Sequence, residues 1–240
     1  IPILQEINPH VLESFQNTLE YLNESQSLIN DATKNISEQV VSYKHNLLTL
    51  NCKKLNELPN KKAYLYQLLH TYGFTAWNDV VDLVSGQPGK QVFSKTHRLL
   101  KDRNFLILTT NNQNLTEKGP FVIKETSTEI SHPIKLTILN TTDSTPENNH
   151  QIIINKDLVT YPLSLKKWHH GDAMHPTGMT GSKKISQLFK DKKLSLLDKE
   201  KIWLLADAKD RIIWVIGLRQ DRRFTADKTA TNRLKISFIS

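Results

Sequence analysis

The stretch from Trp168 to Phe189, WHHGDAMHPTGMTGSKKISQLF, decides how the C-terminal part of this chain folds. Its three glycines permit positive φ angles and close approach of the backbone, which predicts a tight loop. Ser182 is expected to cap a helix that begins directly after the loop. On that helix Ile185, Leu188 and Phe189 share one face at helical spacing, so we expect this face to be buried.

Two lysines, Lys183 and Lys184, stand where the loop is expected to become a helix. A helix start offers free backbone N–H groups and the positive end of the helix dipole, and both attract phosphate. The stretch therefore predicts either a phosphate-binding loop or a structural turn followed by a solvated basic helix. The residues alone favour neither alternative.

Other chemistry is not indicated by the residues. Gly178 and Gly181 are separated by two residues, whereas a nucleotide-binding Walker A loop has four between its glycines. The histidines of the stretch lack a second pair of zinc ligands, so no metal site is predicted. Cys52 is the only cysteine, which excludes an internal disulfide. The chain also lacks a nucleophile elbow and a dinucleotide fingerprint, so it is interpreted as a binding module without catalytic residues.

Positive charge is concentrated in the C-terminal part of the chain. Residues 166–240 hold 17 Lys and Arg against 8 Asp and Glu, a net charge of +9, while residues 1–165 hold 15 against 16. Arg219, Arg222 and Arg223 follow an apolar run and carry forked donors that suit phosphate oxygens. A basic segment of this size indicates a polyanionic partner such as nucleic acid.

The N-terminal part is interpreted as mostly helical. Asn8 and Pro9 should begin a helix of about four turns, because apolar residues follow at helical spacing. Further helices are expected over 36–50, 55–72 and 76–84. Alternation around a polar turn at 101–104 then predicts a hairpin within 91–110. Helices followed by a hairpin leave a winged helix that binds duplex DNA as an alternative.

The C-terminal part is interpreted as mixed. Strands are expected at QIIIN (151–155), within YPLSLKKW (161–168), and in a hairpin formed by IWLLAD and RIIWVIGL (202–218). A polar surface loop is expected over 140–150, and LKISFI (234–239) closes the chain in strict alternation. The predicted class is therefore α+β: an N-terminal all-helical region with a hairpin, followed by a small mixed α/β C-terminal domain.

Two further features concern the context of the chain. No apolar run reaches the roughly 20 residues that span a bilayer, so a cytoplasmic protein is expected. The chain begins at Ile1 without an initiator Met, inside the apolar run IPIL, which we interpret as the start of a piece cut from a longer protein.

Two stretches resemble the C-terminal domain of the tRNA(Ile)-lysidine synthetase family, namely LKKWHHGDAMHPTGMTGSKKISQLFKDKKL (165–194) and IIWVIGLRQDRRF (212–224). RLLKDRNFL (98–106) is similar to the end of the family's helical substrate-binding domain, and IPILQEINP (1–9) resembles the segment that leaves its catalytic domain. The resemblance implies a linking helix over 1–35, a substrate-binding domain over 36–110 and a tRNA-binding α+β domain over 111–240. That last domain is of the kind shared with the phenylalanyl-tRNA synthetase β subunit.

The resemblance also implies a function. Members of the family use ATP, with magnesium, to ligate lysine to the wobble cytidine of the CAU anticodon of an isoleucine tRNA. Their ATP site carries a Ser-Gly-Gly-x-Asp-Ser loop in an N-terminal domain, and this chain has no such loop. We therefore expect the tRNA-recognition portion of this ligase, inactive alone and without a bound cofactor. The expected partner is tRNA(Ile), and a homodimer is one alternative for the oligomeric state.

The residues expected to contact tRNA all lie in the basic motif and carry a positive charge or a ring. Trp168 has a second interpretation as a core residue at the end of a strand, and salt bridges to nearby cations account for Asp172, Asp191 and Asp221. The expected set is Lys166, Lys167, Trp168, His170, Lys183, Lys184, Lys190, Arg219, Arg222 and Arg223.

Overall fold

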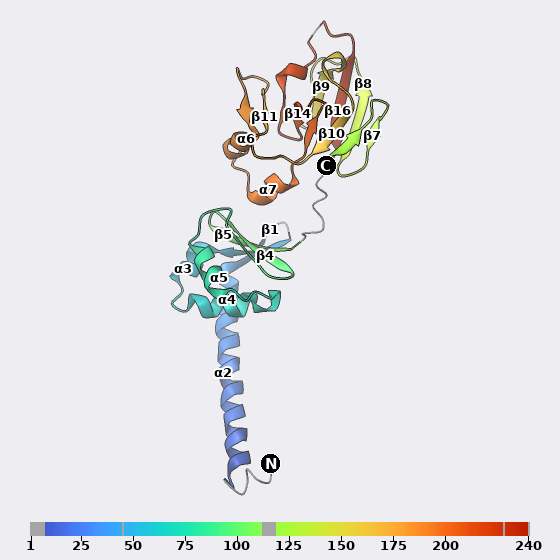
Figure 1. The fold of residues 1–240 in the computed structure, drawn as a ribbon. Helices are drawn as coiled ribbons and strands as arrows, with labels where there is room; N and C mark the ends of the chain where they lie inside the picture. Colours follow the sequence, from blue (N-terminus) through green and yellow to red (C-terminus); the bar gives the residue numbers. More distant parts are fainter. Residues whose placement is uncertain (1–7, 45, 112–118, 228, 240) are drawn as a thin grey trace. The chain divides into compact units, whose positions relative to one another are not determined.

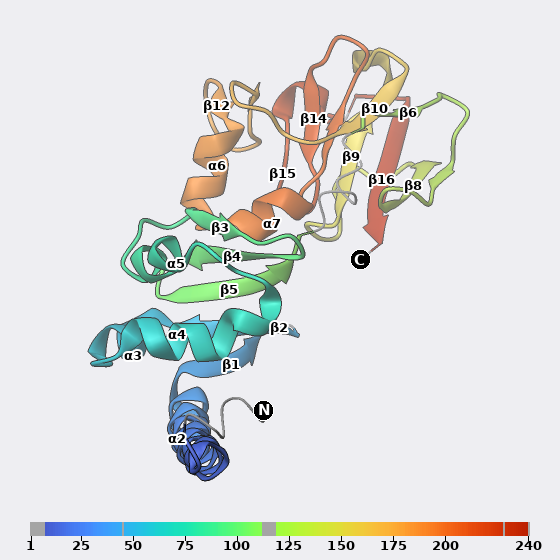
Figure 2. The same ribbon diagram turned by 60° about the horizontal axis from the view of Figure 1, so that its bottom comes forward.

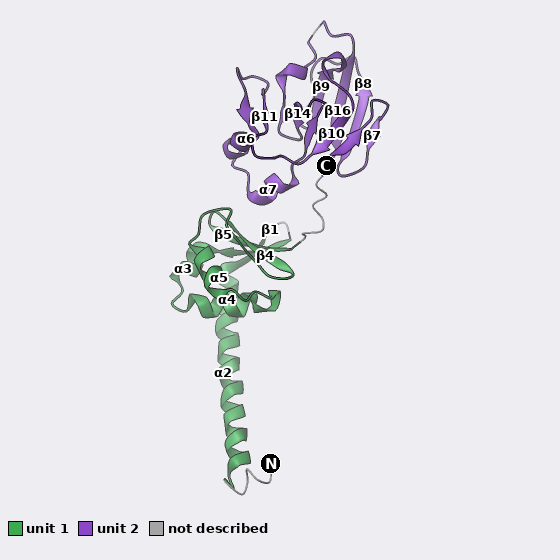
Figure 3. Cartoon of the chain, viewed as in Figure 1, with its two compact units in different colours: residues 1–113 green, residues 114–240 purple. Residues whose placement is uncertain are grey.

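A computed structural model describes residues 8–44, 46–111, 119–227 and 229–239 (Figure 1). The chain splits into two compact units, Ile1–Gln113 and Asn114–Ser240 (Figure 3). The IPIL run at residues 1–4, on which the interpretation as a piece of a longer protein depends, lies outside the described residues. Within these residues no helix is both long and apolar enough to cross a membrane.

From residue 8 onward, the first element of the first unit is one long helix, α2 (Val11–Val40), rather than the short helix that the sequence predicts. The side chain of Asn8 accepts a hydrogen bond of 3.0 Å from the backbone N–H of His10, so it shapes the turn just ahead of the helix. Val40, at the other end, is buried in the core of the unit. The helix passes through residues 35 and 36 without a break, so the predicted boundary between a linking helix and the next domain is not marked by a loop.

The predicted helix over 36–50 is wrong beyond Val40. The chain leaves α2 at Val41 and forms two antiparallel strands, β1 (Val41–Lys44) and β2 (Leu47–Asn51), in which Val41 pairs with Leu50. The helical spacing in this stretch is weak, and its β-branched and aromatic residues favour a pleated surface. β2 then pairs with β5, a partner far away in sequence, which local periodicity does not reveal.

The first unit is completed by a five-stranded antiparallel sheet with short helices packed against it (Figures 1 and 2). The strand order is β1-β2-β5-β4-β3, so the predicted hairpin forms three strands of a larger sheet. The remaining elements are α3 (Cys52–Glu57), α4 (Lys61–Leu69), η1 (His70–Tyr72), α5 (Trp77–Val84), β3 (Gln91–Phe93), β4 (His97–Asp102) and β5 (Phe105–Thr110).

Residues 119–227 and 229–239 of the second unit form two antiparallel sheets and a two-stranded ribbon. The sheet orders are β15-β14-β13-β10-β6 and β7-β8-β16-β9, and the ribbon pairs β11 with β12. The strands are β6 (Phe121–Ile123), β7 (Glu129–Ile130), β8 (Lys135–Asn140), β9 (Gln151–Asn155), β10 (Leu163–Lys166), β11 (Ala173–Met174), β12 (Lys183–Lys184), β13 (Leu204–Ala206), β14 (Ile212–Val215), β15 (Arg219–Gln220) and β16 (Arg233–Ile239). The helices are η2 (Lys156–Leu158), α6 (Ile185–Asp191), α7 (Leu196–Lys201) and η3 (Arg222–Phe224).

The larger sheet of this unit is buried on both faces. Leu205 of β13 belongs to the core that this sheet shares with the four-stranded sheet, whereas its neighbour Leu204 packs in a second cluster with α6. Ile185, Leu188 and Phe189 of α6 are buried in that second cluster, as the helical spacing predicts. The α+β class is confirmed, and the expectation of an all-helical N-terminal region with only a hairpin is corrected by β1 and β2.

Candidate nucleic-acid interface

Residues 173–177 lie between two basic segments of the second unit and pair with both. On one side β11 pairs with β12, so that Ala173 lies opposite Lys184. On the other side Pro176 forms a bridge with Asp221, and the backbone N–H of Arg222 donates a hydrogen bond of 2.8 Å to the carbonyl of His175. This extended segment therefore places the lysine pair and the Arg219–Arg223 turn next to one another.

Asp221 fixes the second of these contacts. Its carboxylate is fully buried and accepts backbone hydrogen bonds from His175 at 2.8 Å and from Arg223 at 2.9 Å. The Arg223 guanidinium adds two more bonds, from Nε at 3.0 Å and from Nη2 at 2.8 Å, and these bonds raise the pKa of Arg223. A buried carboxylate is stable only when its oxygens are paired, and here donors from two segments pair it.

Asp172 is a second acceptor inside the loop. It accepts a hydrogen bond of 2.7 Å from the backbone N–H of His169, and the Lys166 ammonium lies 3.3 Å from its carboxylate. Lys166 also pairs with Asp210 at 2.7 Å, and only 12% of its side chain is exposed. Lys166 is therefore held between two carboxylates of its own chain.

The glycines of the loop are required by backbone conformation. Gly171, Gly178 and Gly181 have φ angles of 103°, 77° and 88°, in the left-handed region that favours glycine, as predicted. A Cβ atom at any of these three positions would meet nothing within 4 Å among the described residues, so the predicted close approach of another backbone segment is not found.

The predicted helix start is also corrected. Lys183 and Lys184 form strand β12, and α6 begins at Ile185, whose backbone N–H donates to the carbonyl of Asp172 at 2.9 Å. Lys184 takes the N-cap position and its side chain makes no capping bond, so Ser182 is not the cap. The loop is thus tied into the fold by the pairing of β11 with β12 and by the backbone N–H of Ile185, which is already bonded, and the first turn of α6 has no side-chain cap.

The lysines of the pair have different surroundings. The Lys183 ammonium forms an ion pair with Asp191 at the end of α6, and this contact lowers the pKa of Asp191. Lys184 is exposed, and no ion pair links it to another described residue. One lysine therefore joins β12 to α6, and the other points away from these contacts into solvent.

The side chains of Lys167 and Trp168 contact other residues of the second unit. The Lys167 ammonium donates to the carbonyl of Glu200 at 2.7 Å and lies 3.9 Å from the centre of the Trp203 ring. Burial lowers the pKa of Lys167 to about 8, against the opposing charge of Glu200. Trp168 meets Phe189 edge to face with ring centres 5.4 Å apart, in agreement with its core interpretation.

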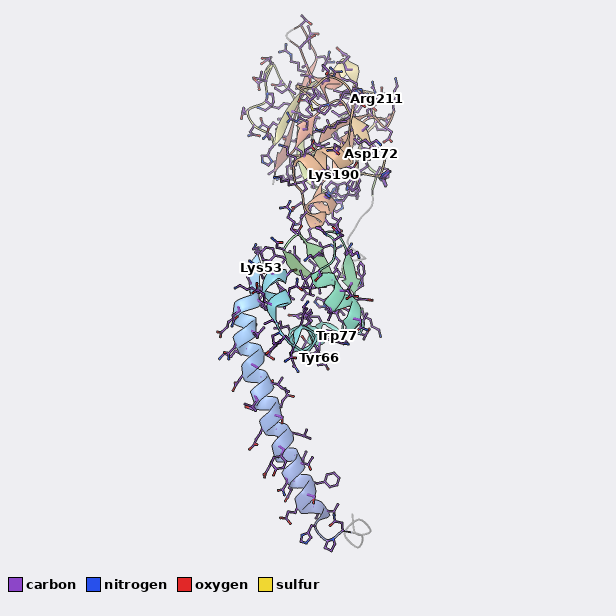
Figure 4. The ribbon with its side chains drawn as sticks, turned by 90° about the vertical axis from the view of Figure 1, so that its left-hand side faces the viewer. Lys53, Tyr66, Trp77, Asp172, Lys190 and Arg211 are labelled. Carbon is purple, nitrogen blue, oxygen red and sulfur yellow. The ribbon has the colours of Figure 1, made fainter. Side chains whose placement is uncertain are left out.

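The exposed members of the expected set are Lys184, Lys190, Arg219, Arg222, Arg223 and His170. Part of the Arg223 guanidinium is not available to a ligand, because it is bound to Asp221. Figure 4 labels Asp172, within the loop, and Lys190, on α6. Lys192, which directly follows α6, is exposed as well and was missed, although its place in the basic run KDKK could have indicated it. Among the residues described, His, Cys, Asp and Glu side chains do not gather in groups of three that could hold a metal.

Two family models match the chain. The TilS substrate binding domain matches residues 38–112, within the first unit, and the TilS substrate C-terminal domain matches residues 163–236, within the second. The matches together cover the sheet of the first unit and the whole basic motif of the second.

Proteins named tRNA(Ile)-lysidine synthase are similar over almost the full chain. The protein of Parabacteroides distasonis is 34% identical over 245 residues, which cover 100% of this chain and 55% of that protein. The protein of Bacteroides thetaiotaomicron is 31% identical, covering 95% of this chain and 51% of that protein. That of Bacillus subtilis is 25% identical, covering 92% and 50%. The chain spans about half the length of these curated relatives.

Two solved structures are similar at lower levels. A crystal structure of a TilS C-terminal domain has a TM-score of 0.41 and 20% identity, covering 50% of this chain and 91% of that one. An N-terminal fragment of the phenylalanyl-tRNA synthetase β subunit from Pyrococcus horikoshii has a TM-score of 0.36 and 13% identity, covering 74% and 66%.

Asp221→Asn should destabilise the second unit. The change removes the negative charge that pairs the Arg223 guanidinium and leaves an amide hydrogen facing the buried donors, so we expect a loss of about 3 kcal/mol in the free energy of unfolding. Denaturant unfolding measures this loss. Asp210→Asn is the matched control, because Asp210 is exposed and Lys166 keeps Asp172 as a partner. Equal losses in the two variants would contradict the role of Asp221.

Lys167 should make stability rise with pH above about 8. Its pKa is about 8 in the folded chain against 10.5 for an ordinary lysine, so between these values the unfolded chain binds more protons and the free energy of unfolding increases with pH. Lys167→Met lacks this contribution. The difference in the free energy of unfolding, wild type minus variant, should therefore increase from pH 7 to pH 10. A constant difference would show that Lys167 titrates normally.

Proposed function

The chain belongs to the tRNA(Ile)-lysidine synthase family, and from this we propose that it forms the tRNA-binding portion of such a synthase. The whole enzyme would use ATP to attach lysine to the wobble cytidine of tRNA(Ile), and this chain would hold the tRNA. The proposal includes the cytoplasm as the location, where tRNA is available.

The observation that carries the proposal is the group of exposed cations around residues 173–177. Lys184 lies opposite Ala173 in the ribbon, and Arg222 bonds through its backbone to His175, so the two residues flank one short segment. Neither side chain forms an ion pair with another described residue, which leaves both charges available to phosphate oxygens. Contacts of this kind position a nucleic acid without reading its sequence.

We add Lys190 and Arg219 to the proposed tRNA contacts. Lys190 is exposed on α6, whose apolar face is buried, and Arg219 is exposed on β15, next to the buried Gln220. Each of these two cations is therefore next in sequence to a buried residue, Phe189 or Gln220, which fixes the local backbone. Lys166, Lys167 and Lys183, by contrast, bind groups of their own chain, so we place the tRNA contacts on the four exposed cations and on His170.

The winged-helix alternative is not favoured. Its candidate region, residues 60–110, lies in a unit whose five-stranded sheet has outer strands from residues 41–44 and 91–93. This region holds 7 Lys and Arg against 3 Asp and Glu, a net charge of +4, which is less than half of the +9 over residues 166–240. A protein that binds duplex DNA through a wing would concentrate its positive charge in the wing region, whereas here the larger excess lies in residues 166–240.

We do not place ATP chemistry on this chain. The sequence contains no glycine-rich nucleotide loop, and the described residues provide no cluster of acidic side chains for magnesium. We expect the isolated chain to show no ATP-dependent incorporation of labelled lysine into tRNA(Ile), when measured beside a full-length family member as positive control. Incorporation above background would contradict this division of roles.

Replacing Lys184 and Arg222 together by alanine should weaken binding of a tRNA(Ile) transcript at least about tenfold. Each lost phosphate contact removes roughly 0.7–0.9 from the slope of log affinity against log salt, so the slope should fall by about 1.5. Fluorescence anisotropy at several salt concentrations measures both quantities.

The matched control for this pair is Lys53→Ala with Lys209→Ala. Both of these lysines are exposed, and one lies in the other unit while the second lies in a hairpin turn, so the net charge changes equally at sites outside the motif. If the control variant loses as much affinity and slope as the motif variant, binding depends only on total charge and the proposed surface is wrong.

A further inference from the structure

Two aromatic side chains line a hollow on the surface of the first unit, which we call the aromatic hollow. Its volume is about 620 Å³, within the range of about 300–1,000 Å³ that small-ligand sites occupy. Tyr66 of α4 and Trp77 of α5 contribute their rings to its wall, and the ring centres are 4.9 Å apart. Figure 4 labels both residues. The two short helices therefore bring a pair of rings to one place on the surface.

The two rings differ in how much they contribute to packing. Trp77 is half-buried and packs against the core of the unit. Tyr66 is 45% exposed, so nearly half of its surface is available to a ligand. Trp77 thus forms a fixed wall, and Tyr66 is the ring that a ligand can contact without disturbing the core.

One face of the Tyr66 ring is open toward the aromatic hollow. His70, one helical turn further along the chain, stacks on Tyr66 with ring centres 5.2 Å apart and an angle of 14° between the ring planes. His70 is not part of the wall of the hollow, whereas Lys62 and Ala63, one turn before Tyr66, are. The hollow therefore lies on the side of the ring away from His70, where a third flat ring would extend the stack.

Two lysines line the hollow, and neutral groups hold them. The Lys62 ammonium donates to the side-chain oxygen of Asn78 at 2.8 Å, and the Lys61 ammonium donates to that of Asn56 at 2.6 Å. Among the residues that the structure describes, no ion pair joins either lysine to an acid. The amides therefore orient both ammonium groups without neutralising them, and their charge is available to an anion such as phosphate.

A second hollow shares part of the same wall. It has a volume of about 420 Å³, and Lys62 and Trp77 line it together with other residues of 75–79. A chain that leaves the first hollow thus finds room on the other side of Trp77. Asp79 lines only the second hollow, so a phosphate is favoured at the first, beside Lys61 and Lys62.

We propose that the aromatic hollow binds one unpaired nucleotide of RNA, with its base stacked on Tyr66 beside Trp77 and its phosphate at Lys61 and Lys62. Aromatic rings stack on the face of any base, and that face is accessible only where the base has left the duplex. The proposal rests on the proposed function, because a folded tRNA carries unpaired nucleotides. It adds a contact in the first unit to those of the basic motif in the second.

The open position of the hollow favours a nucleotide within a longer strand over a free one. Pro59, Ala63 and Tyr66, which line it, are all exposed, so a ligand there stays partly in solvent. Sites for free small ligands usually bury about 70–90% of the ligand surface. A nucleotide of a bound RNA needs less, because the other contacts of the RNA raise its effective concentration at the hollow.

The first experiment removes the stacking ring from the full chain. Tyr66→Ala should weaken binding of fluorescein-labelled hexa-adenylate RNA at least about fivefold in fluorescence anisotropy, because one base stack contributes at least this factor. Tyr66→Phe keeps the ring and should bind like wild type. The matched control is Tyr43→Ala, since Tyr43 is 72% exposed on β1 of the same unit. With folding checked by circular dichroism, equal affinities of the Tyr66→Ala and Tyr43→Ala variants overturn the proposal.

The second experiment tests the phosphate contact. Lys62→Ala should lower the slope of log affinity against log salt by roughly 0.7, the value for one phosphate of a single strand. Lys53→Ala removes the same charge from α3, and Figure 4 shows Lys53 away from Tyr66 and Trp77. An equal fall in this control would show that the strand responds only to the charge of the unit, which overturns the placement of the phosphate.

Competition identifies the ligand. Unlabelled hexa-adenylate should displace the labelled strand, whereas AMP and a long RNA duplex, each at the same phosphate concentration, should displace far less. Equal displacement by AMP would indicate a site for free nucleotides, and equal displacement by the duplex would indicate an electrostatic contact without stacking. Either result overturns the proposal.

A last comparison separates this site from the tRNA contacts of the second unit. The Lys184→Ala and Arg222→Ala double variant should still bind hexa-adenylate at the aromatic hollow, while Tyr66→Ala should weaken binding of the tRNA(Ile) transcript about fivefold or more. If Tyr66→Ala leaves transcript binding unchanged while the double variant weakens it, the aromatic hollow is not a tRNA contact and only the proposed function stands. If the wild-type chain binds hexa-adenylate through Tyr66 but no transcript, the proposed function fails instead.

Discussion

A single buried carboxylate holds the basic surface of the second unit in place. Asp221 has no exposed surface, so each of its oxygens must be satisfied inside the protein, and the donors come from residues 46 and 2 positions away in sequence. Satisfying it requires that the end of the glycine-rich loop lie against the Arg219–Arg223 turn. The same segment pairs with β12 through Ala173 and Met174, and the start of α6 bonds to Asp172, so the loop is held on both of its edges.

The basic motif divides its cations between two tasks. Neighbouring residues of the same type are used differently: Lys183 pairs with Asp191 while Lys184 faces solvent, and Arg223 binds Asp221 while Arg222 is exposed. The inward members fix the backbone from which the outward members project. A net charge of +9 over this segment therefore overstates the charge available to a ligand, since several cations are neutralised by acids of the same chain.

Local patterns in the sequence predicted those parts of the fold that depend on local spacing. The face made by Ile185, Leu188 and Phe189 and the alternation of Leu234 and Ile236 follow directly from the periods of helices and strands, and all five residues are buried. The strands at 41–51 could not be predicted in this way, because the partner of β2 is β5, more than fifty residues later. The division of the lysines could not be predicted either, because it depends on which acids the tertiary fold brings within reach.

The double burial of strand β13 has a consequence for recognition. Leu204 packs with α6 on one face of the sheet and Leu205 packs with the second sheet on the other, so the helix that carries Lys190 is fastened to the centre of the unit through adjacent residues of one strand. Under the proposed function, a tRNA that meets this helix would find its backbone already ordered, and association would cost mainly the freedom of the long cationic side chains. Shape selectivity for a folded polyanion would then arise from the spacing of fixed attachment points, which a flexible basic tail of the same charge does not have.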